Sequence, residues 1–426
     1  MKKFYFSYLV FLLLFITAQS YSQLSYGWSE QNSGFTGNLW SVSAVDSNVV
    51  WASGDSLKVL RTTNGGINWS VISVEQTGSR TIFPVYNIFA IDANNAICTG
   101  SSNTYTSVYK TTNGGVNWST VFNQIGGFID NIFMFSNTNG FMSGDPVGGR
   151  FSLWKTTDGG NSWDSTGLYL ASYSGESGVI NNLFVDGNNV WMGIQGSYKI
   201  FRSTNYGSNW TMFYTPAIVN CFWSNNPSSG FYILGATQLY STTNSGGNWS
   251  QIPGTPGSAY LCGLTGIGNE WWYIRNGLSI YYSSNNGTSW TTQYTVPSKN
   301  FSAISKARMS KYIWCVRNTG GISRYGIVSG IINISKSVPS EYKLFQNYPN
   351  PFNPKTKIKF DIKENTYVTL KIFDIMGKEI SILINQNLNS GSYSADFDAS
   401  LLSSGIYFYV LKADNFIDTK RMIIVK

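Results

Sequence analysis

The feature that most constrains the fold of this 426-residue chain is an eight-residue phrase that recurs six times. The copies are TTNGGINW ending at Trp69, TTNGGVNW at Trp118, TTDGGNSW at Trp163, STNYGSNW at Trp210, TTNSGGNW at Trp249 and SSNNGTSW at Trp290. Successive tryptophans are 39 to 49 residues apart, with a mean of about 44. Repeats of this length are typical of β-propellers, in which each repeat forms one blade of four strands.

The residues around each copy support this assignment. Around the first copy the sequence contains LWSVSAVD, VVWASGD, KVLRTTNGG and INWSVIS, four short alternating segments separated by Asp, Asn and Gly. This pattern is typical of short antiparallel strands joined by turns. The chain is 42% hydrophobic and only 12% charged, which excludes a disordered, coiled-coil or collagen-like protein. We therefore predict an all-β protein.

Each copy of the phrase has the chemistry of a hairpin turn between the third and fourth strands of a blade. An Asn or Asp side chain bonds nearby backbone amides, glycine accepts a positive φ, and tryptophan packs between blades. We predict a structural role for the paired residues of the six copies, which are Asn64 and Trp69, Asn113 and Trp118, Asp158 and Trp163, Asn205 and Trp210, Asn244 and Trp249, and Asn285 and Trp290.

This phrase resembles the Asp-box, or BNR repeat, of sialidases, sortilin-type receptors, xyloglucanases and photosystem II assembly propellers. Asn replaces Asp in five of the six copies. In the families that it resembles, the turn lies on the propeller face away from the ligand. The resemblance therefore implies that the best-marked residues of the sequence are not its binding residues.

A seventh, degenerate repeat follows Trp290, with segments near Phe301 and Trp314 and from Gly320 to Gly326, but without the phrase and without a fourth strand. The segment YGWSEQNS, from Tyr26 to Ser33, resembles the fourth strands of the other repeats. Pairing it with the last repeat would close the ring and remove exposed sheet edges. We predict a seven-bladed β-propeller over residues 23–330, closed by its N-terminal strand.

Residues 1–22 have the pattern of a secretory signal peptide, with Lys2 and Lys3, an apolar stretch and small residues before Gln23. A membrane anchor is the alternative, but the apolar stretch is shorter than the roughly 20 residues that span a bilayer. The four cysteines, Cys98, Cys221, Cys262 and Cys315, are widely spaced, so we expect buried thiols and no disulfide framework.

The composition changes after Ile331. We assign residues 331–341 to a linker and residues 342–426 to a small C-terminal β-sandwich, because short alternating strands separated by turn residues follow there. The proline-rich stretch from Tyr348 to Pro354 predicts an extended backbone. A generic adhesive sandwich would share this pattern.

Four motifs in this C-terminal segment closely resemble the type A sorting domain of the type IX secretion system. They are LFQNYPNPFNPKTKIKF, VTLKIFDIMGKEI, SGSYSADFDASLLSSGIYFYVLK and a terminal TKRMIIVK. The resemblance implies interaction with the type IX secretion machinery. It also implies a bacterial protein that is secreted or held at the outer-membrane surface.

The chain contains no histidine, which excludes Ser-His-Asp and Cys-His catalysis and every His-ligated metal site. We predict no metal and no cofactor. Residues 24–330 carry 15 basic and 12 acidic residues, a net charge of +3, with no cluster of Lys and Arg. We therefore expect no nucleic-acid binding, and we expect a monomer.

In a propeller, ligands meet the face formed by the loops that join fourth to first and second to third strands. Two of these loops, before Tyr86 and before Val179, are longer than the usual four to six residues, and long loops on rigid scaffolds tend to carry function. Alternatively, they only cover the channel. The candidate ligand-binding residues on this face are Asp55, Glu75, Arg80, Tyr105, Asp145, Arg150, Tyr169, Tyr173, Glu176 and Arg275.

Two functions compete on this face. The first is non-catalytic binding of extracellular polysaccharide or of a surface protein by aromatic stacking and a few polar groups. The second is a glycoside hydrolase, because the phrase occurs in sialidases and xyloglucanases and two carboxylates suffice for glycoside hydrolysis. Glu176, Tyr173 and Asp145 are candidates for catalysis, but we assign no catalytic residue. The chaperone role of the photosystem II assembly propellers does not transfer with the scaffold.

Overall fold

The computed structural model describes residues 26–74, 84–101, 105–226, 230–234, 237–308, 310–327, 332–335, 338–399 and 402–426. These residues form two compact units, Tyr26–Gly326 and the part of the chain that begins at Ile327, and each unit is described separately below. The predicted signal peptide, residues 1–22, lies outside the described residues.

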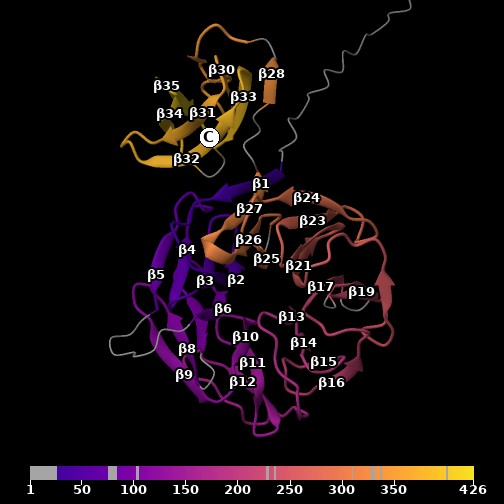
Figure 1. Ribbon diagram of the computed structural model, residues 1–426. Helices are drawn as coiled ribbons and strands as arrows, with labels where there is room; N and C mark the ends of the chain where they lie inside the picture. Colours follow the sequence, from indigo (N-terminus) through magenta and orange to yellow (C-terminus); the bar gives the residue numbers. More distant parts are fainter. Residues whose placement is uncertain are drawn as a thin grey trace, which may run out of the picture. The chain divides into compact units, whose positions relative to one another are not determined.

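The described residues of the N-terminal unit form seven antiparallel sheets. Figure 1 shows them arranged in a ring, with the first strand of each sheet innermost. In hydrogen-bonding order they are β2 (Leu39–Ala44), β3 (Val50–Gly54), β4 (Lys58–Thr62) and β5 (Ser70–Ser73); β6 (Val85–Ala90), β7 (Ala96–Ser101), β8 (Tyr105–Thr111) and β9 (Ser119–Ile125); β10 (Ile129–Met134), β11 (Gly140–Val147) and β12 (Arg150–Thr156); β13 (Leu183–Asp186), β14 (Asn189–Gly193), β15 (Lys199–Ser203) and β16 (Thr211–Tyr214); β17 (Cys221–Asn226), β18 (Gly230–Leu234), β19 (Leu239–Thr242) and β20 (Ser250–Ile252); β21 (Leu261–Ile267), β22 (Glu270–Arg275), β23 (Ser279–Ser283) and β24 (Thr291–Thr295); and β25 (Phe301–Lys306), β26 (Ile313–Arg317), β27 (Ile322–Ile327) and β1 (Tyr26–Gln31).

Burial follows the position of each strand in its sheet. Every residue of β3 is buried, because the second strand is covered on both faces by neighbouring sheets, whereas β5 at the outer edge is exposed or half-buried. Short runs of small and apolar residues such as VWASG fit this doubly covered position. The 3-10 helix η1 (Asn318–Gly320) is the only helical element among the described residues. No helix in this part of the chain is long and apolar enough to cross a membrane.

The last sheet combines the two ends of the unit, because β1 is hydrogen-bonded beside β27. Trp28 Nε1 donates to Gln293 Oε1 at 2.8 Å, and its ring stacks on Tyr294 at 5.9 Å. Glu30 forms an ion pair with Arg317 and accepts hydrogen bonds from Ser323 Oγ and the Tyr294 hydroxyl. The strand is thus attached to two sheets by side chains as well as by its backbone.

The third sheet departs from the expected four strands. After Trp163, the described residues beside β12 form no fourth strand but two isolated bridges, Lys155 with Asp164 and Arg150 with Ala171. The long connection to β13, residues 165–182, leaves the sheet edge after Asp164 and returns to it at Ala171. This repeat therefore contributes a long loop where the other five copies of the phrase are followed by a strand.

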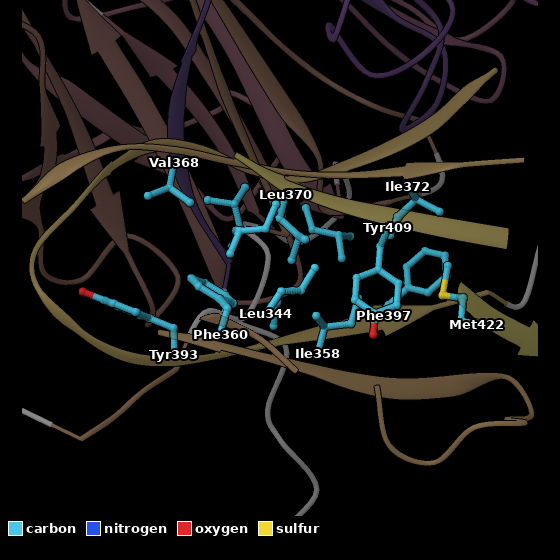
Figure 2. Close-up of a cluster of buried hydrophobic side chains, with 14 of the residues drawn as sticks. Leu344, Ile358, Phe360, Val368, Leu370, Ile372, Tyr393, Phe397, Tyr409 and Met422 are labelled. Atoms are coloured by element: carbon cyan, nitrogen blue, oxygen red, sulfur yellow. The ribbon is translucent and has the colours of Figure 1, made fainter. Parts of the chain in front are cut away.

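The C-terminal unit is a β-sandwich of two four-stranded sheets. One sheet has the order β28 (Ile332–Ser335), β33 (Gly391–Asp398), β30 (Lys355–Ile362) and β29 (Lys343–Leu344), and the other has the order β32 (Glu379–Leu388), β31 (Thr366–Phe373), β34 (Gly405–Ala413) and β35 (Phe416–Ile424). Figure 2 shows the buried side chains between the sheets, with Phe360 and Tyr393 from one and Leu370 and Tyr409 from the other.

Two details of this unit differ from the sequence-based assignment. Residues 332–335, assigned to the linker, form β28 and pair with β33, so the sheet begins earlier than expected. The proline-rich stretch bends at residues 349–351, with cis peptide bonds before Pro349 and Pro351, and is not continuously extended. Buried Asn347 holds the bend, because its Nδ2 donates to Pro349 O and to Thr356 Oγ1.

Candidate binding face

The six copies of the repeated phrase form hairpin turns, here called the repeat turns, between the third and fourth strand positions of their sheets. In the first, Thr62 Oγ1 accepts a hydrogen bond from Gly66 N at 2.9 Å and donates to Asn64 Oδ1 at 2.9 Å. Asn64 Oδ1 also accepts from Asn68 N at 3.0 Å. The same three bonds occur in the other five turns. The polar side chains that mark the phrase are thus used within the turn.

Asp158 occupies the position that is Asn in the other five turns. Hydrogen bonds from Ser162 lower the pKa of its carboxyl group far below the usual range. Its Oδ1 also accepts from Thr156 Oγ1 and from the backbone amides of Asn161 and Ser162. An acceptor oxygen is what all six turns require, and either side chain supplies it.

The tryptophans of the repeat turns pack beside neighbouring sheets. The ring of Trp118 lies 6.2 Å from that of Trp51 in the preceding sheet, and the ring of Trp210 lies 5.8 Å from Phe141. Trp69 donates to Gln31 of β1, and Trp249 donates to the carbonyl of Tyr214. Trp163 packs in a cluster that contains Ile97 of the preceding sheet, whereas Trp290 contacts Trp271 and Tyr273 of its own sheet.

The opposite end of the ring collects the loops that join fourth to first and second to third strands, because these connections lie at one end of antiparallel sheets. A cavity of about 450 Å³ opens there. We call its lining the channel mouth, which consists of Asn38, Leu39, Trp40, Val179, Ile180, Asn181, Asn220, Leu261, Cys262, Asn276, Asn300, Phe301, Ser302 and Asn318. Six of these residues are asparagines and none is charged.

Five of the six carboxamides of the channel mouth fall into two groups, and the sixth, that of Asn318, has a buried Oδ1 with no hydrogen-bond partner among the described residues. Asn38 Oδ1 accepts from the amide of Thr319, and Asn181 bonds Trp40 and Ser41 of the first sheet and Asn87 of the second, so both are used to hold loops. Asn220 is half-buried and Asn276 and Asn300 are exposed. Their side chains bond no other group in the part of the chain that the structure describes. These three carboxamides can therefore donate to and accept from a ligand.

An aromatic row runs along the rim of the mouth across the first three sheets. The ring of Trp40 lies 5.4 Å from Tyr86, which lies 5.8 Å from Phe128, and all three are half-buried. Asp55 accepts from Trp40 Nε1 at 2.8 Å and from the amide of Asn38 at 2.9 Å. Burial and the nearby Asp55 raise the pKa of the Tyr86 hydroxyl. Asp55 therefore fixes the residues that line the mouth.

The long loop of residues 165–182 reaches across the mouth to other sheets. Asn181 accepts from Ser41 Oγ and donates to the carbonyl of Trp40 at 3.2 Å. Two aspartates bond the loop: the Asp145 carboxylate accepts from the amide of Gly178 at 2.8 Å, and the backbone carbonyl of Asp130 accepts from the amide of Asn181. The loop thus forms part of the rim and carries Ile180 and Asn181 into the mouth.

Asp130 is an unusual support for this loop. Its side chain is buried, and its Oδ2 has no hydrogen-bond partner within the described ranges. Burial and repulsion from Asp145 raise the pKa of this carboxyl group well above its ordinary value. A Cβ at Gly178 would collide with Asp130, so the loop approaches the carboxyl group closely only because this position is glycine. The sequence analysis did not select Asp130, since nothing around it forms a motif.

Glu176, in the same loop, forms an ion pair with Lys199 of β15. Its Oε1 lies 2.5 Å from Lys199 Nζ, and both side chains are almost completely buried. Burial would raise the pKa of this carboxyl group, but hydrogen bonds from Lys199 and from the Tyr173 amide outweigh it and lower the pKa. The ring of Tyr173 covers the ammonium group at 4.4 Å. Lys199 is a second residue that sequence reasoning missed, because it stands alone at the start of a strand.

The other candidates on this face have different environments. Arg275 is buried, and its guanidinium donates to the carbonyls of Pro256, Ala259 and Thr237, so it organises the loop before β21. Arg150 and Tyr169 are exposed, and Tyr105 is half-buried. Glu75 and Arg80 lie outside the described residues.

A narrower space of about 300 Å³ continues between the inner strands. Arg308 crosses it from the last sheet and donates to the carbonyls of Ala90 and Ile91 in the second. Burial lowers the pKa of the Arg308 guanidinium, against the opposing effect of Asp92. Cys98, Cys221 and Cys315 are buried and Cys262 is half-buried, all as free thiols. The described residues contain no group of three or more potential metal-ligating His, Cys, Asp or Glu side chains.

Comparisons with known proteins separate the two units. Residues 346–426 match the secretion system C-terminal sorting domain. The search of curated proteins finds no match. YCF48 bound to a D1 peptide is similar with a TM-score of 0.58 at 17% identity, covering 70% of this chain and 96% of that one. YCF48 from Cyanidioschyzon merolae has a TM-score of 0.58 at 16% identity, covering 70% of this chain and 98% of that one. The WD40 β-propeller domain of Doa1 has a TM-score of 0.53 at 12% identity, covering 71% of this chain and 97% of that one.

These identities establish the fold of the N-terminal unit and nothing further about it. The expectation of an all-β chain with a propeller and a C-terminal sandwich is confirmed. The chain thus combines a β-propeller with a secretion system C-terminal sorting domain, which implies export through the type IX machinery to the cell surface or the extracellular space.

Proposed function

We propose that this exported β-propeller is a non-catalytic binding protein for an uncharged extracellular polysaccharide, which it holds at the channel mouth. The observation that carries the proposal is the lining of the mouth, with six asparagines, the half-buried ring of Trp40 and no charged side chain. Carboxamides donate to and accept from hydroxyl groups, and an aromatic ring packs against the C–H face of a sugar. The seven-bladed Asp-box ring, closed by β1 and acting as a monomer, is part of this proposal.

The absence of charge in the lining guides the choice of ligand. An acidic polymer would be held by Arg or Lys, as is general for carboxylate and phosphate recognition, and neither residue lines the mouth. A peptide is the competing ligand, because the similar YCF48 protein is bound to a D1 peptide. Polysaccharide is favoured here because the three unengaged carboxamides can bond hydroxyl groups in any direction without fixed charges.

The contacts of the carboxylates favour binding over glycoside hydrolysis. Hydrolysis requires a carboxylic acid and a second carboxylate that both face the substrate. Glu176 is buried in an ion pair with Lys199, and Asp145 accepts from the amides of Gly178 and Phe128. Both candidates are thus occupied in holding loops.

The experiment is retention of the purified protein on insoluble or immobilised polymers: cellulose, xylan, mannan and starch as uncharged polymers, pectin and alginate as charged ones. We expect saturable retention on at least one uncharged polymer and loss of retention in the double variant Asn276→Ala, Asn300→Ala. Asn269→Ala is the matched control, because Asn269 is an exposed asparagine in the β21–β22 turn at the other end of the ring. Equal retention of the double variant, retention only on charged polymers, or binding only to an immobilised peptide library would overturn the proposal.

A further inference from the structure

Exposed tyrosines gather on the same end of the ring as the channel mouth. Five of them are 61 to 74% exposed, namely Tyr169, Tyr173, Tyr198, Tyr214 and Tyr260. By position they belong to loops or strand ends that join fourth to first or second to third strands. Large exposed rings are unfavourable in water, so several at one end of a rigid scaffold point to a ligand.

Two of these tyrosines lie beside one buried lysine. Lys199 Nζ lies 4.4 Å from the ring centroid of Tyr173. Tyr214 is the direct cross-strand partner of Lys199 in the pairing of β15 with β16, which places the two side chains on one face of the sheet. Tyr173 and Tyr214, which we call the tyrosine cluster, thus come from two separate segments.

The charge under this cluster is neutralised. Lys199 is paired with Glu176 at 2.5 Å, and the two side chains are 7% and 3% exposed. The rings are therefore presented above a buried ion pair, and no net charge reaches the surface from these two residues. Such a surface offers apolar ring faces and phenolic hydroxyl groups to a ligand.

The loops that carry the cluster also carry the mouth. Residues 165–182 hold Tyr173 and, further along, Ile180 and Asn181 of the mouth. Ser177 in this loop pairs with Gln195 in the loop before Tyr198. The carbonyl of Tyr198 accepts from the amide of Thr215, at the start of the connection that leads to Asn220 of the mouth. A chain-like ligand in the mouth can therefore continue over the cluster on the same loops.

We propose that the tyrosine cluster is a second sugar-binding subsite, on which successive rings of a linear uncharged polysaccharide stack while other rings of the same chain occupy the channel mouth. This inference rests on the proposed function. The protein then binds internal stretches of a long chain, and Tyr173, whose ring lies over the Lys199–Glu176 pair, is the main stacking platform. Tyr214, on the same face of the sheet as Lys199, lies beside it.

The test is the dependence of affinity on chain length. Xylo-, cello-, manno- and malto-oligosaccharides of two to eight sugars are titrated calorimetrically into the purified protein and into Tyr173→Ala and Tyr214→Ala. We expect the wild type to gain affinity with chain length and both variants to lose about three- to tenfold on the longest chain, since one ring contact contributes about 0.5–1.5 kcal/mol. Binding of the disaccharide is expected to stay unchanged.

Two controls make the outcomes distinct. Tyr206→Ala removes an exposed tyrosine from a repeat turn at the other end of the ring and should bind every length like the wild type. If the tyrosine variants keep wild-type affinity for the longest chain while Asn276→Ala weakens all lengths, the subsite is wrong and the channel mouth stands. If the tyrosine variants weaken binding and Asn276→Ala does not, the mouth is wrong and the cluster binds alone. Wild-type protein that binds no oligosaccharide overturns both.

Discussion

The two ends of the propeller use polar side chains in opposite ways. At the repeat turns, the Asn or Asp and the hydroxyl residue of each turn bond the turn itself, and the tryptophan packs against strands beside it. At the channel mouth, the side chains of Asn220, Asn276 and Asn300 form no hydrogen bond in the described parts of the chain. The end that is easiest to recognise in the sequence therefore stabilises the ring, and the end without a motif is available to a ligand.

Loss of an aromatic ring should reduce the folding stability more at the repeat-turn end than at the channel mouth. We expect Trp118→Ala to lower the free energy of unfolding by about 3–5 kcal/mol, because it removes a buried ring that packs against Trp51. Chemical denaturation followed by circular dichroism measures the effect. Trp40→Ala at the mouth is the matched variant, and we expect a smaller loss of stability with a larger loss of polysaccharide retention. A reversed order would remove the contrast between the two ends.

At one part of the mouth end, a buried charge makes the folding stability equally sensitive to a substitution. Glu176→Gln leaves Lys199 charged and buried without its carboxylate, and we expect a loss of about 3 kcal/mol at neutral pH. The lowered pKa of Glu176 stabilises the folded protein above the unfolded value of about 4.3, and this stabilisation is lost as the pH falls through the lower folded value. The acid-induced loss should therefore be weaker in the variant.

The control for this variant is Glu341→Gln in the C-terminal unit, where the ion pair with Lys343 is exposed. Such pairs contribute about 0–1 kcal/mol, so little change in melting is expected. Equal melting curves for Glu176→Gln and the wild type between pH 3 and pH 8 would show that the Lys199–Glu176 pair does not hold the loop.

The sequence predicts the parts of this molecule that depend on local patterns. The repeated phrase indicates both the strand order and the position of each turn, because turn hydrogen bonds join residues within six positions of one another. The third sheet was not anticipated, since the residues around Trp163 carry the same phrase but the segment after Asp164 forms a loop.

The channel mouth could not be predicted from local patterns. Asn38, Asn220, Asn276 and Asn300 are single amides in separate loops, and only closure of the ring brings them together. Likewise, Glu176 was selected for its loop, but its partner Lys199 begins a strand without any motif. Candidates such as Arg275 were placed at the correct end of their strands, yet whether such a side chain faces solvent or the protein depends on neighbouring loops.

Asp130 offers a gain of stability at the mouth end. The raised pKa of its buried carboxyl group means that stability is greatest below the unfolded value of about 3.9 and falls as the pH rises toward the folded value. We expect Asp130→Asn to remove this penalty and to raise the melting temperature at pH 7 by about 2 °C. At pH 4 the two proteins should melt alike. A variant that is less stable at pH 7 would mean that the ionised carboxylate is required.

The smallest expected change in stability provides the sharpest contrast between the two ends. Asn276→Ala and Asn64→Ala make the same chemical change, but Asn64 Oδ1 bonds Thr62 and Asn68, whereas Asn276 offers its carboxamide to solvent. We expect Asn276→Ala to alter the free energy of unfolding by less than about 0.5 kcal/mol, and Asn64→Ala to lower it by about 1 kcal/mol. Polysaccharide retention should change in the opposite order, because only Asn276 lies at the mouth. If Asn276→Ala destabilises the ring as much as Asn64→Ala does, its carboxamide supports the fold, and the channel mouth loses one of the three groups on which its assignment as a binding site depends.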